Sequence, residues 1–138
     1  MSPANSNDVL NRLSVIHNRS LPMYLAYAPP FYRRANDDAR ATIENIVSYQ
    51  QEIVDRIGTL IVERHGTVDN GAFPMVFTGY HDLSVEFLIS KMIELQTKDV
   101  DTIQSCVDDL SDDPIAKAIA EEALGAAKGH LDTLQELG

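Results

Sequence analysis

The chain has 138 residues, of which 44% are hydrophobic and 23% are charged, so it is long enough for one domain with a sizeable core. Its 21 Asp and Glu residues outnumber its 11 Lys and Arg residues, which gives a formal net charge of −10. Nucleic acids and anionic membranes attract clustered Lys and Arg, so this balance argues against both as partners. We expect residues 1–138 to form a single globular domain.

The cellular compartment is inferred from the cysteine content and from the apolar segments. Cys106 is the single cysteine, which excludes an internal disulfide and fits a reducing compartment. Residues 1–8 are polar and carry no apolar signal-peptide core, and no apolar run approaches the ~20 residues of a membrane span. We therefore expect a cytoplasmic protein in which Cys106 is a core residue.

The first predicted helix covers roughly residues 7–28, because apolar residues recur on one face with helical spacing. Pro29-Pro30 should end it, since a proline disfavours helical backbone in the residue before it. Pro22 lies inside this segment and should kink the helix, with Ser20 bonding the freed backbone. The apolar face consists of Val9, Leu13, Ile16, Leu21, Tyr24 and Ala28.

The second predicted helix starts near Asn36-Asp37-Asp38, which provides good N-cap chemistry. It should end at Arg64-His65-Gly66, with cations in the last turn and a glycine at the C-cap. Its apolar face consists of Ile43, Ile46, Val47, Ile53, Val54, Ile57, Leu60 and Ile61.

Two more helices follow in the second half of the chain. One starts near Asp82, and the other opens at Asp113-Pro114, an N-cap followed by a proline in the first helical position. Alanines in the last helix, together with Gly125 and Gly129, predict a close approach between helices. The apolar faces consist of Val85, Ile89, Met92, Val100, Ile103, Val107 and Leu110 in one helix, and Ile115, Ile119, Ala123, Ala126, Ala127, Leu134 and Leu137 in the other.

The lengths of the connections predict the topology. The first two helices are joined by the short segment 29–35 and the last two by 111–113, so each pair should form an antiparallel hairpin. Residues 66–81 are much longer, with turn signals at 69–71 and 73–74, and can cross the whole length of a bundle. The sequence therefore predicts an all-α four-helix bundle of two antiparallel hairpins joined by a long crossover.

Each predicted helix carries one polar residue in the middle of its apolar face. These residues are His17, Gln50, Gln96 and His130. An unpaired polar group in an apolar core costs about 1–3 kcal/mol, so these side chains should be buried and should face one another.

The helix pattern, the crossover and the spacing of these four residues resemble the ferritin-like superfamily. In that family each hairpin carries a Glu on its first helix and a Glu-x-x-His motif on its second, about 33 residues later. His17 and Gln50 are 33 positions apart and match the two Glu positions of the first hairpin, with Ile53 in place of the motif His. Gln96 and His130 are 34 positions apart, and if His130 is the motif His, Ala127 replaces its Glu.

Short segments also resemble an uncharacterised bacterial ferritin-like group. They are Leu21-Pro22-Met23-Tyr24-Leu25, Phe73-Pro74, Tyr80-His81-Asp82-Leu83-Ser84 and Gly129-His130-Leu131. The resemblance implies the ferritin-like fold over nearly the whole chain.

The carboxylates that a di-iron site needs are missing from the predicted ring. Glu94 is the nearest candidate, but it shares a face with Lys91, Lys98 and Asp101, opposite the apolar face, and should lie in solvent. The other carboxylates considered lie off the apolar faces of their helices, and these are Glu52, Asp55, Glu121, Glu122 and Asp132.

The leading interpretation is a ferritin-like protein that lacks standard di-iron chemistry and needs no cofactor, with hydrogen-bonded polar side chains in place of the metal pair. One alternative is a metal-dependent oxidoreductase or metal-binding protein, with iron, manganese or zinc at His17, Gln50, Gln96 and His130. Another is a larger ligand bound between the helices. A further alternative is an interaction module that forms a homodimer through a helix face. Whether the protein is an enzyme stays open, and Tyr27, Phe31 and Tyr32 are interpreted as a cap on the bundle end.

Overall fold

The computed structural model describes the backbone of residues 3–137 and the side chains of residues 5–137. Within that range the protein is helical and contains no strand. The α-helices are α1 (Pro3–Asn18), α2 (Leu21–Tyr27), α3 (Asp37–Glu63), α4 (Val85–Asp109) and α5 (Pro114–Leu137), and the 3-10 helices are η1 (Arg34–Asn36) and η2 (Met75–Asp82).

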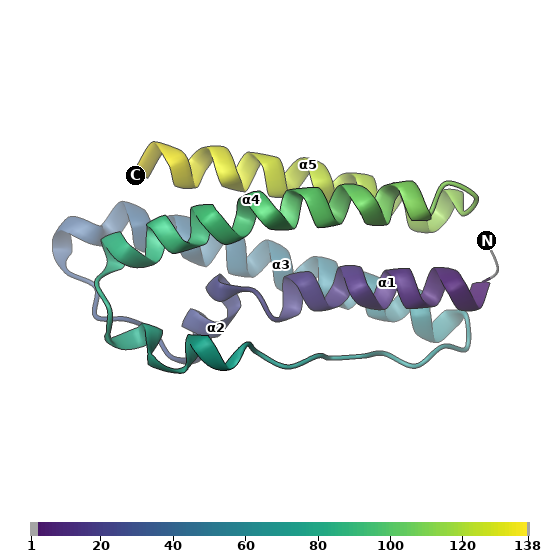
Figure 1. Cartoon of the computed structure of the whole chain (residues 1–138), viewed down its shortest axis with the longest axis horizontal. Coiled ribbons are helices and arrows are strands. Elements are labelled where there is room, and N and C mark those ends of the chain that lie inside the picture. Colours follow the sequence, from purple (N-terminus) through teal and green to yellow (C-terminus); the bar gives the residue numbers. More distant parts are fainter. Residues whose placement is uncertain (1–2, 138) are drawn as a thin grey trace.

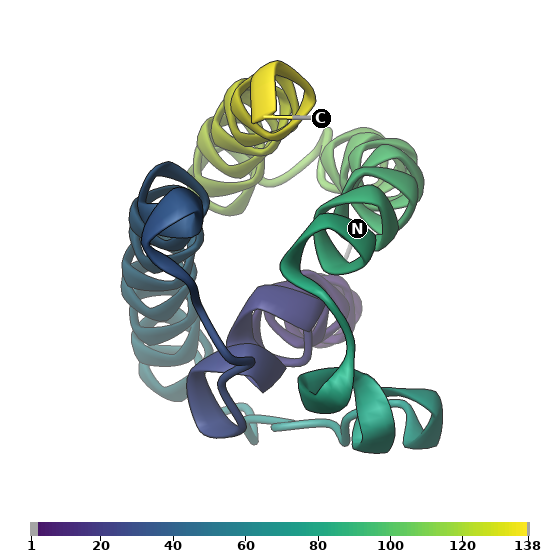
Figure 2. The same ribbon diagram turned by 90° about the vertical axis from the view of Figure 1, so that its left-hand side faces the viewer.

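The long helices lie lengthwise against one another (Figure 1). Helices α1 and α5 run in one direction, and α3 and α4 run in the other (Figure 1). Seen end-on, α1 packs between α3 and α4, and α5 packs between the same two helices on the opposite side (Figure 2). Each hairpin, α1–α3 and α4–α5, is therefore antiparallel, as the short connections predict.

The crossover (residues 66–84) runs along α1 for the length of the molecule and contains η2 in its second half (Figure 1). Polar side chains of α1 and of the residue that follows it hold the crossover through its backbone. The Asn11 amide donates to the Thr67 carbonyl at 2.8 Å and accepts from the Asp69 N–H at 2.8 Å. Arg19, just after α1, donates from Nε to the Asn70 carbonyl at 2.8 Å. At the predicted turn, Gly71 has a φ of +65°, a conformation that favours glycine.

The first predicted helix is broken rather than kinked. The chain leaves the helix at Arg19, and Ser20 has an extended backbone with φ −71° and ψ 162°. The Ser20 hydroxyl accepts a hydrogen bond from the Met23 N–H, so Ser20 is the N-cap of α2, and Pro22 lies in the first turn where proline is tolerated. Ser20 does bond the freed backbone, but it starts a new helix by doing so.

The end of α3 lies where it was predicted, but the glycine has a different role. Arg64 is the C-cap, and His65 adopts the left-handed conformation with a φ of +63°. The Gly66 N–H donates to the Ile61 carbonyl at 2.9 Å, and the His65 N–H donates to the Val62 carbonyl at 3.0 Å. These two bonds form a Schellman motif in which histidine occupies the position that glycine usually takes.

The start of α4 and the buried face of α5 differ from the prediction. Helix α4 begins at Val85, three residues later than the predicted Asp82, and the Ser84 hydroxyl accepts a hydrogen bond from the Phe87 N–H as its N-cap. Helix α5 starts at Pro114, as predicted. In α5 the helix is rotated so that Ile115 is 64% exposed, and a Cβ at Gly125 or Gly129 would meet nothing within 4 Å. Small residues carry the close approach to α4, and the buried residues of α5 are Ala116, Ala120, Ala123, Leu124, Ala127 and Leu134.

Tyr27 and Phe31 do not cap the bundle end, because both are 82% exposed, and only Tyr32 is half-buried. Six aromatic rings lie in successive contact where α2 and η2 meet, with centroid distances of 5.3–6.3 Å and with the two end rings exposed. In order of contact they are Tyr27, Phe73, Tyr24, Phe77, Tyr80 and Phe87.

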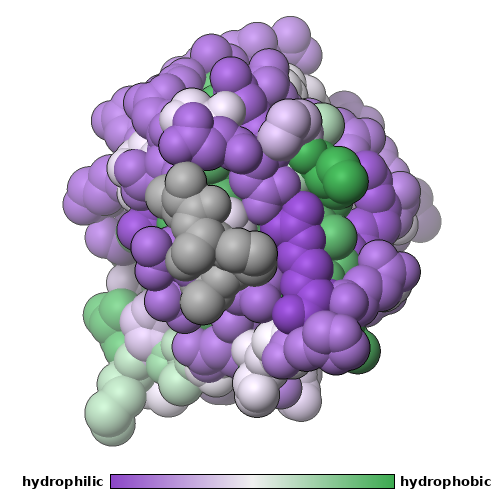
Figure 3. Space-filling model, turned by 90° about the vertical axis from the view of Figure 1, so that its right-hand side faces the viewer, coloured by the Kyte–Doolittle hydropathy of each residue, from purple (hydrophilic) through white to green (hydrophobic). Residues whose placement is uncertain are grey.

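The surface at the opposite end, where α1 begins, is mostly hydrophilic with separate hydrophobic patches (Figure 3). Cys106 is fully buried in the core, as predicted. None of the helices among residues 3–137 is both long enough and apolar enough to span a membrane.

Candidate functional site

Three of the four predicted ring residues are buried. His17 and Gln50 are each 3% exposed and Gln96 is 6% exposed. The predicted burial of His130 is wrong: this residue is half-buried, and its ring packs edge-on against Tyr49 with centroids 5.4 Å apart. The rotation of α5 that buries its alanines leaves His130 at the rim of the core.

His17 is held in a defined tautomer by the turn of α1 that precedes it. Its Nδ1 lies 2.8 Å from the Leu13 carbonyl, and because a carbonyl can only accept, Nδ1 carries the hydrogen. Burial lowers the pKa of His17, and the positive charge that His130 can carry lowers it further. Burial also lowers the pKa of His130. The neutral form of each imidazole is therefore favoured near pH 7, with Nε2 of His17 unprotonated.

Gln50 is held by the break between α1 and α2. The Ser20 hydroxyl donates a 2.6 Å hydrogen bond to Gln50 Oε1 while the same hydroxyl caps α2. One serine therefore starts α2 and also satisfies a buried amide of α3, which explains why both groups are tolerated in the core.

Gln96 bridges the two helices of the second hairpin. Its Nε2 donates to the Ala127 carbonyl of α5 at 3.1 Å. The methyl side chain of Ala127 leaves room for the amide to reach the backbone. Ala127 stands where the ferritin-like resemblance would place the motif Glu, and it contacts Gln96 through its backbone carbonyl instead of through a carboxylate.

Tyr49, which is not among the four residues predicted from the sequence, also belongs to this region, where its ring packs against His130. Its hydroxyl is buried and has no hydrogen-bond partner among the described residues. Burial raises the pKa of Tyr49 to about 12, so the hydroxyl stays protonated. The signal that could have identified Tyr49 is its position next to Gln50 on α3.

Within the described part of the chain, no three His, Cys, Asp or Glu residues are grouped so that they could hold a metal ion. Glu94 is exposed, as predicted, and pairs with Lys91 at 3.3 Å and Lys98 at 3.8 Å. The five other carboxylates considered are exposed as well, and they are Glu52, Asp55, Glu121, Glu122 and Asp132. The ring therefore offers imidazole nitrogens and amide oxygens without a negative charge, a donor set that does not fit a pair of iron cations.

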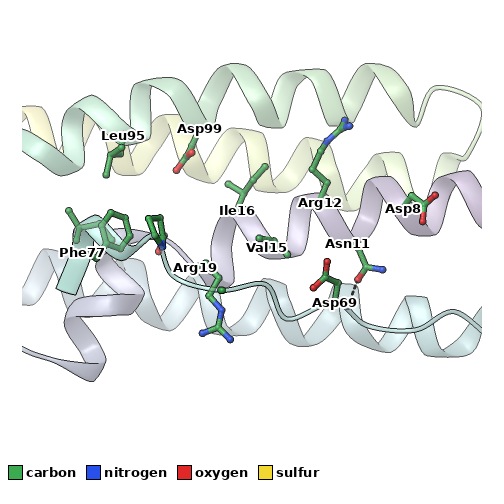
Figure 4. A pocket seen from close by; sticks show the side chains of 14 residues that line it. Asp8, Asn11, Arg12, Val15, Ile16, Arg19, Asp69, Phe77, Leu95 and Asp99 are labelled. Carbon is green, nitrogen blue, oxygen red and sulfur yellow. Dashed lines mark hydrogen bonds between the residues drawn. The ribbon is translucent and has the colours of Figure 1, made fainter.

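A cavity of about 620 Å³ lies between α1, the crossover and α4 (Figure 4), and its lining includes Ser20, the hydrogen-bond partner of Gln50. Its lining is mostly apolar and includes Ile16, Leu21, Phe77 and Leu95. Its size falls within the range of small-molecule sites in proteins.

Asp99 is the carboxyl group that α4 contributes to the lining of this cavity, and it points toward α1 close to Ile16 (Figure 4). Burial raises its pKa to about 6. Asp99 is not among the predicted site residues, but it lies three residues after Gln96 and four before the buried Ile103, so helical spacing places it on the inner face.

Chemically, the region combines neutral polar side chains, three of them buried and hydrogen-bonded, with a cavity that contains a partly buried carboxyl group. No family model, curated protein or solved structure was found to match the chain.

Proposed function

We propose that this chain is a ferritin-like four-helix bundle that does not carry out di-iron chemistry, and that its polar core stabilises the packing of the two hairpins. Two antiparallel hairpins joined by one long crossover are the connections typical of ferritin-like folds, which supports the fold assignment. The spacing of His17, Gln50, Gln96 and His130 supports it independently.

The observation that carries this proposal concerns the carboxylates. In the part of the chain that the structure describes, Glu94 and the five other candidate carboxylates are all exposed, so none of them joins the four polar residues. The ring groups also have partners within the protein: Ser20 bonds Gln50, and Gln96 bonds the Ala127 carbonyl. A pair of divalent cations would lack compensating charge in such a site, and neutral hydrogen-bonded groups are stable there without metal.

The test is metal analysis of the protein produced without chelators, together with a His17→Ala, His130→Ala double variant. His65→Ala is the matched control, because His65 is an exposed histidine at the end of α3. We expect substoichiometric metal in all three proteins and an unchanged melting temperature at pH 7 after addition of EDTA. Stoichiometric iron, manganese or zinc that the double variant alone loses would overturn the proposal.

That result would support the alternative, a mononuclear metal site, and iron or manganese rather than the redox-inactive zinc would point to an oxidoreductase. The lowered pKa values of His17 and His130 favour the metal site, because a metal binds neutral imidazole. Gln96 would be the third ligand through Oε1, because its Nε2 is the atom that donates to the Ala127 carbonyl.

A homodimer is the second candidate, and exposed apolar side chains near the α2–η2 end favour it. Tyr27 is 82% exposed and Met75 is 85% exposed. Exposed apolar side chains that together form a patch mark protein–protein contacts. The test is the molar mass in solution by light scattering. A dimer that becomes monomeric in a Tyr27→Ser, Met75→Ser variant supports this candidate, and a concentration-independent monomer contradicts it.

A further inference from the structure

We propose that the cavity between α1, the crossover and α4 binds a small organic cation, an amine with an apolar body, whose ammonium group pairs with Asp99. The proposal goes beyond the polar core, because the cavity is formed by different side chains and needs no metal. It rests on the shape of the cavity, on its lining and on the group in it that has no charged partner.

The lining combines apolar walls with an excess of carboxylates. Ile16, Phe77 and Leu95 provide apolar surface, and Asp8 and Asp69 add two further carboxylates to Asp99. The volume of about 620 Å³ accommodates a small organic molecule. The formal net charge of −10 also raises the local concentration of cations around the protein.

The two cationic side chains of the lining are already engaged elsewhere. Arg12 donates to Asp109 at 2.8 Å, and Arg19 donates to the Asn70 carbonyl while its guanidinium lies 4.6 Å from the centre of the Phe73 ring. Both guanidinium groups point away from Asp99 (Figure 4). An anionic ligand would therefore have to displace these contacts, whereas a cationic ligand meets a carboxyl group that no described side chain pairs with.

Asp99 is partly buried in the cavity wall and no described side chain pairs with it, which makes it a favourable site for an incoming cation. A carboxylate held in apolar surroundings has lost hydration, and a ligand ammonium group placed beside it restores a charge-assisted hydrogen bond. A neutral ligand of the same shape fills the same walls but leaves the carboxylate unpaired.

The test compares 3-phenylpropylamine with its neutral analogue 3-phenylpropanol, by calorimetric titration at pH 7.5 in low salt. We expect the amine to bind about tenfold more tightly than the alcohol, because a hydrogen bond to a charged group contributes about 1.4 kcal/mol or more. Asp99→Asn should remove that difference, and Asp101→Asn, an exposed carboxylate on the same helix, should preserve it.

A steric variant locates the binding. Ala72 is an exposed residue of the lining, so Ala72→Trp should obstruct the cavity without disturbing the core, and both probes should then bind more weakly. Circular dichroism melts confirm that each variant is folded. Equal affinity for the two probes, an amine preference that survives Asp99→Asn, or no saturable binding at the highest soluble concentration would overturn the proposal.

Discussion

Asp99 is expected to reduce the stability of the protein above pH 6. Its folded pKa of about 6 exceeds the ordinary value of 3.8, so between these values the folded protein holds a proton that the unfolded chain has released. The free energy of unfolding therefore falls as pH rises from about 4 to about 6. A difference of about two pKa units corresponds to about 3 kcal/mol.

Replacing Asp99 with asparagine should stabilise the protein by up to about 3 kcal/mol at pH 8 and have little effect at pH 4. Urea unfolding at both pH values measures this, with Asp101→Asn as the exposed control. An Asp99→Asn variant that is no more stable than the wild type at pH 8 would show that the carboxylate is well solvated in the folded protein.

The two ring histidines are expected to have the opposite pH dependence. Their folded pKa values lie below the ordinary 6.5, so the unfolded chain takes up protons before the folded protein does. Stability is then fully present above pH 6.5 and is lost as pH falls toward the folded values. Because the Asp99 contribution changes in a neighbouring range, the measurement is cleanest in the Asp99→Asn background.

In that background, a His17→Gln, His130→Gln double substitution should flatten the loss of stability below pH 6.5. Thermal unfolding at closely spaced pH values measures the slope, and His65→Gln serves as the control because His65 is exposed. If the slope survives the double substitution, other groups are responsible for the acid loss.

At the scale of the elements, the end of α3 contains a correctable strain. His65 holds the left-handed conformation with φ +63°, which costs a residue with a Cβ about 1 kcal/mol. His65→Gly should raise the free energy of unfolding by about 0.5–1 kcal/mol, part of the gain being lost to the greater freedom of glycine in the unfolded chain. Gly66→Ala should do the opposite, because its Cβ would lie 2.6 Å from Asn7 Nδ2 and 2.9 Å from Ile61 Cγ2. Denaturant unfolding of both variants measures the two effects.

Asp113 connects the end of α3 to the start of α5. It accepts two hydrogen bonds from Arg64, at 2.5 and 2.9 Å, and its Oδ1 accepts from the Ala116 N–H at 3.3 Å as the N-cap of α5. The hydrogen bonds from Arg64 lower the pKa of Asp113 to about 2, so its contribution to stability is lost as pH falls from about 4 to about 2.

Asp113→Ala should cost about 1–2 kcal/mol for the lost cap and more for the unpaired Arg64. Asp113→Asn retains a good N-cap and loses only the charge, so its cost should be smaller. Denaturant unfolding at pH 7 separates the two. Equal losses in both variants would mean that the ion pair accounts for the whole effect.

The helices were predictable where periodicity and capping agree. Apolar spacing and the Asp113-Pro114 pair located α5, and the same spacing located α3. The break before α2 was not predictable from the proline alone, because Ser20-Leu21-Pro22 fits a kink within one helix as well as an N-cap followed by a first-turn proline. The rotation of α5 depends on which small residues fit against α4, and single-helix periodicity does not contain that information.

At the scale of the whole molecule, the burial of three of the four polar residues was predictable, and the cavity was not. His17, Gln50 and Gln96 are buried because each interrupts an apolar face. The cavity exists only because the crossover lies over α1 opposite Asp99, and that position is fixed by hydrogen bonds between segments more than fifty residues apart. Local sequence patterns do not encode such distant pairings.

The crossover also divides the protein into two helical hairpins at an exposed position. If the chain were cut after Ala72, residues 1–72 would keep the hydrogen bonds of Asn11 and Arg19 to the backbone of the crossover. Residues 73–138 would carry Phe73 and Phe77, whose rings pack on Tyr24 of the first fragment. Each fragment alone would expose one apolar face of every helix and should be poorly helical, since isolated helices are marginal in water. Mixed together, the two fragments should recover the helical circular dichroism signal at a concentration-dependent rate, so that the protein would behave as a pair of complementing halves suited to reporting the proximity of two fusion partners.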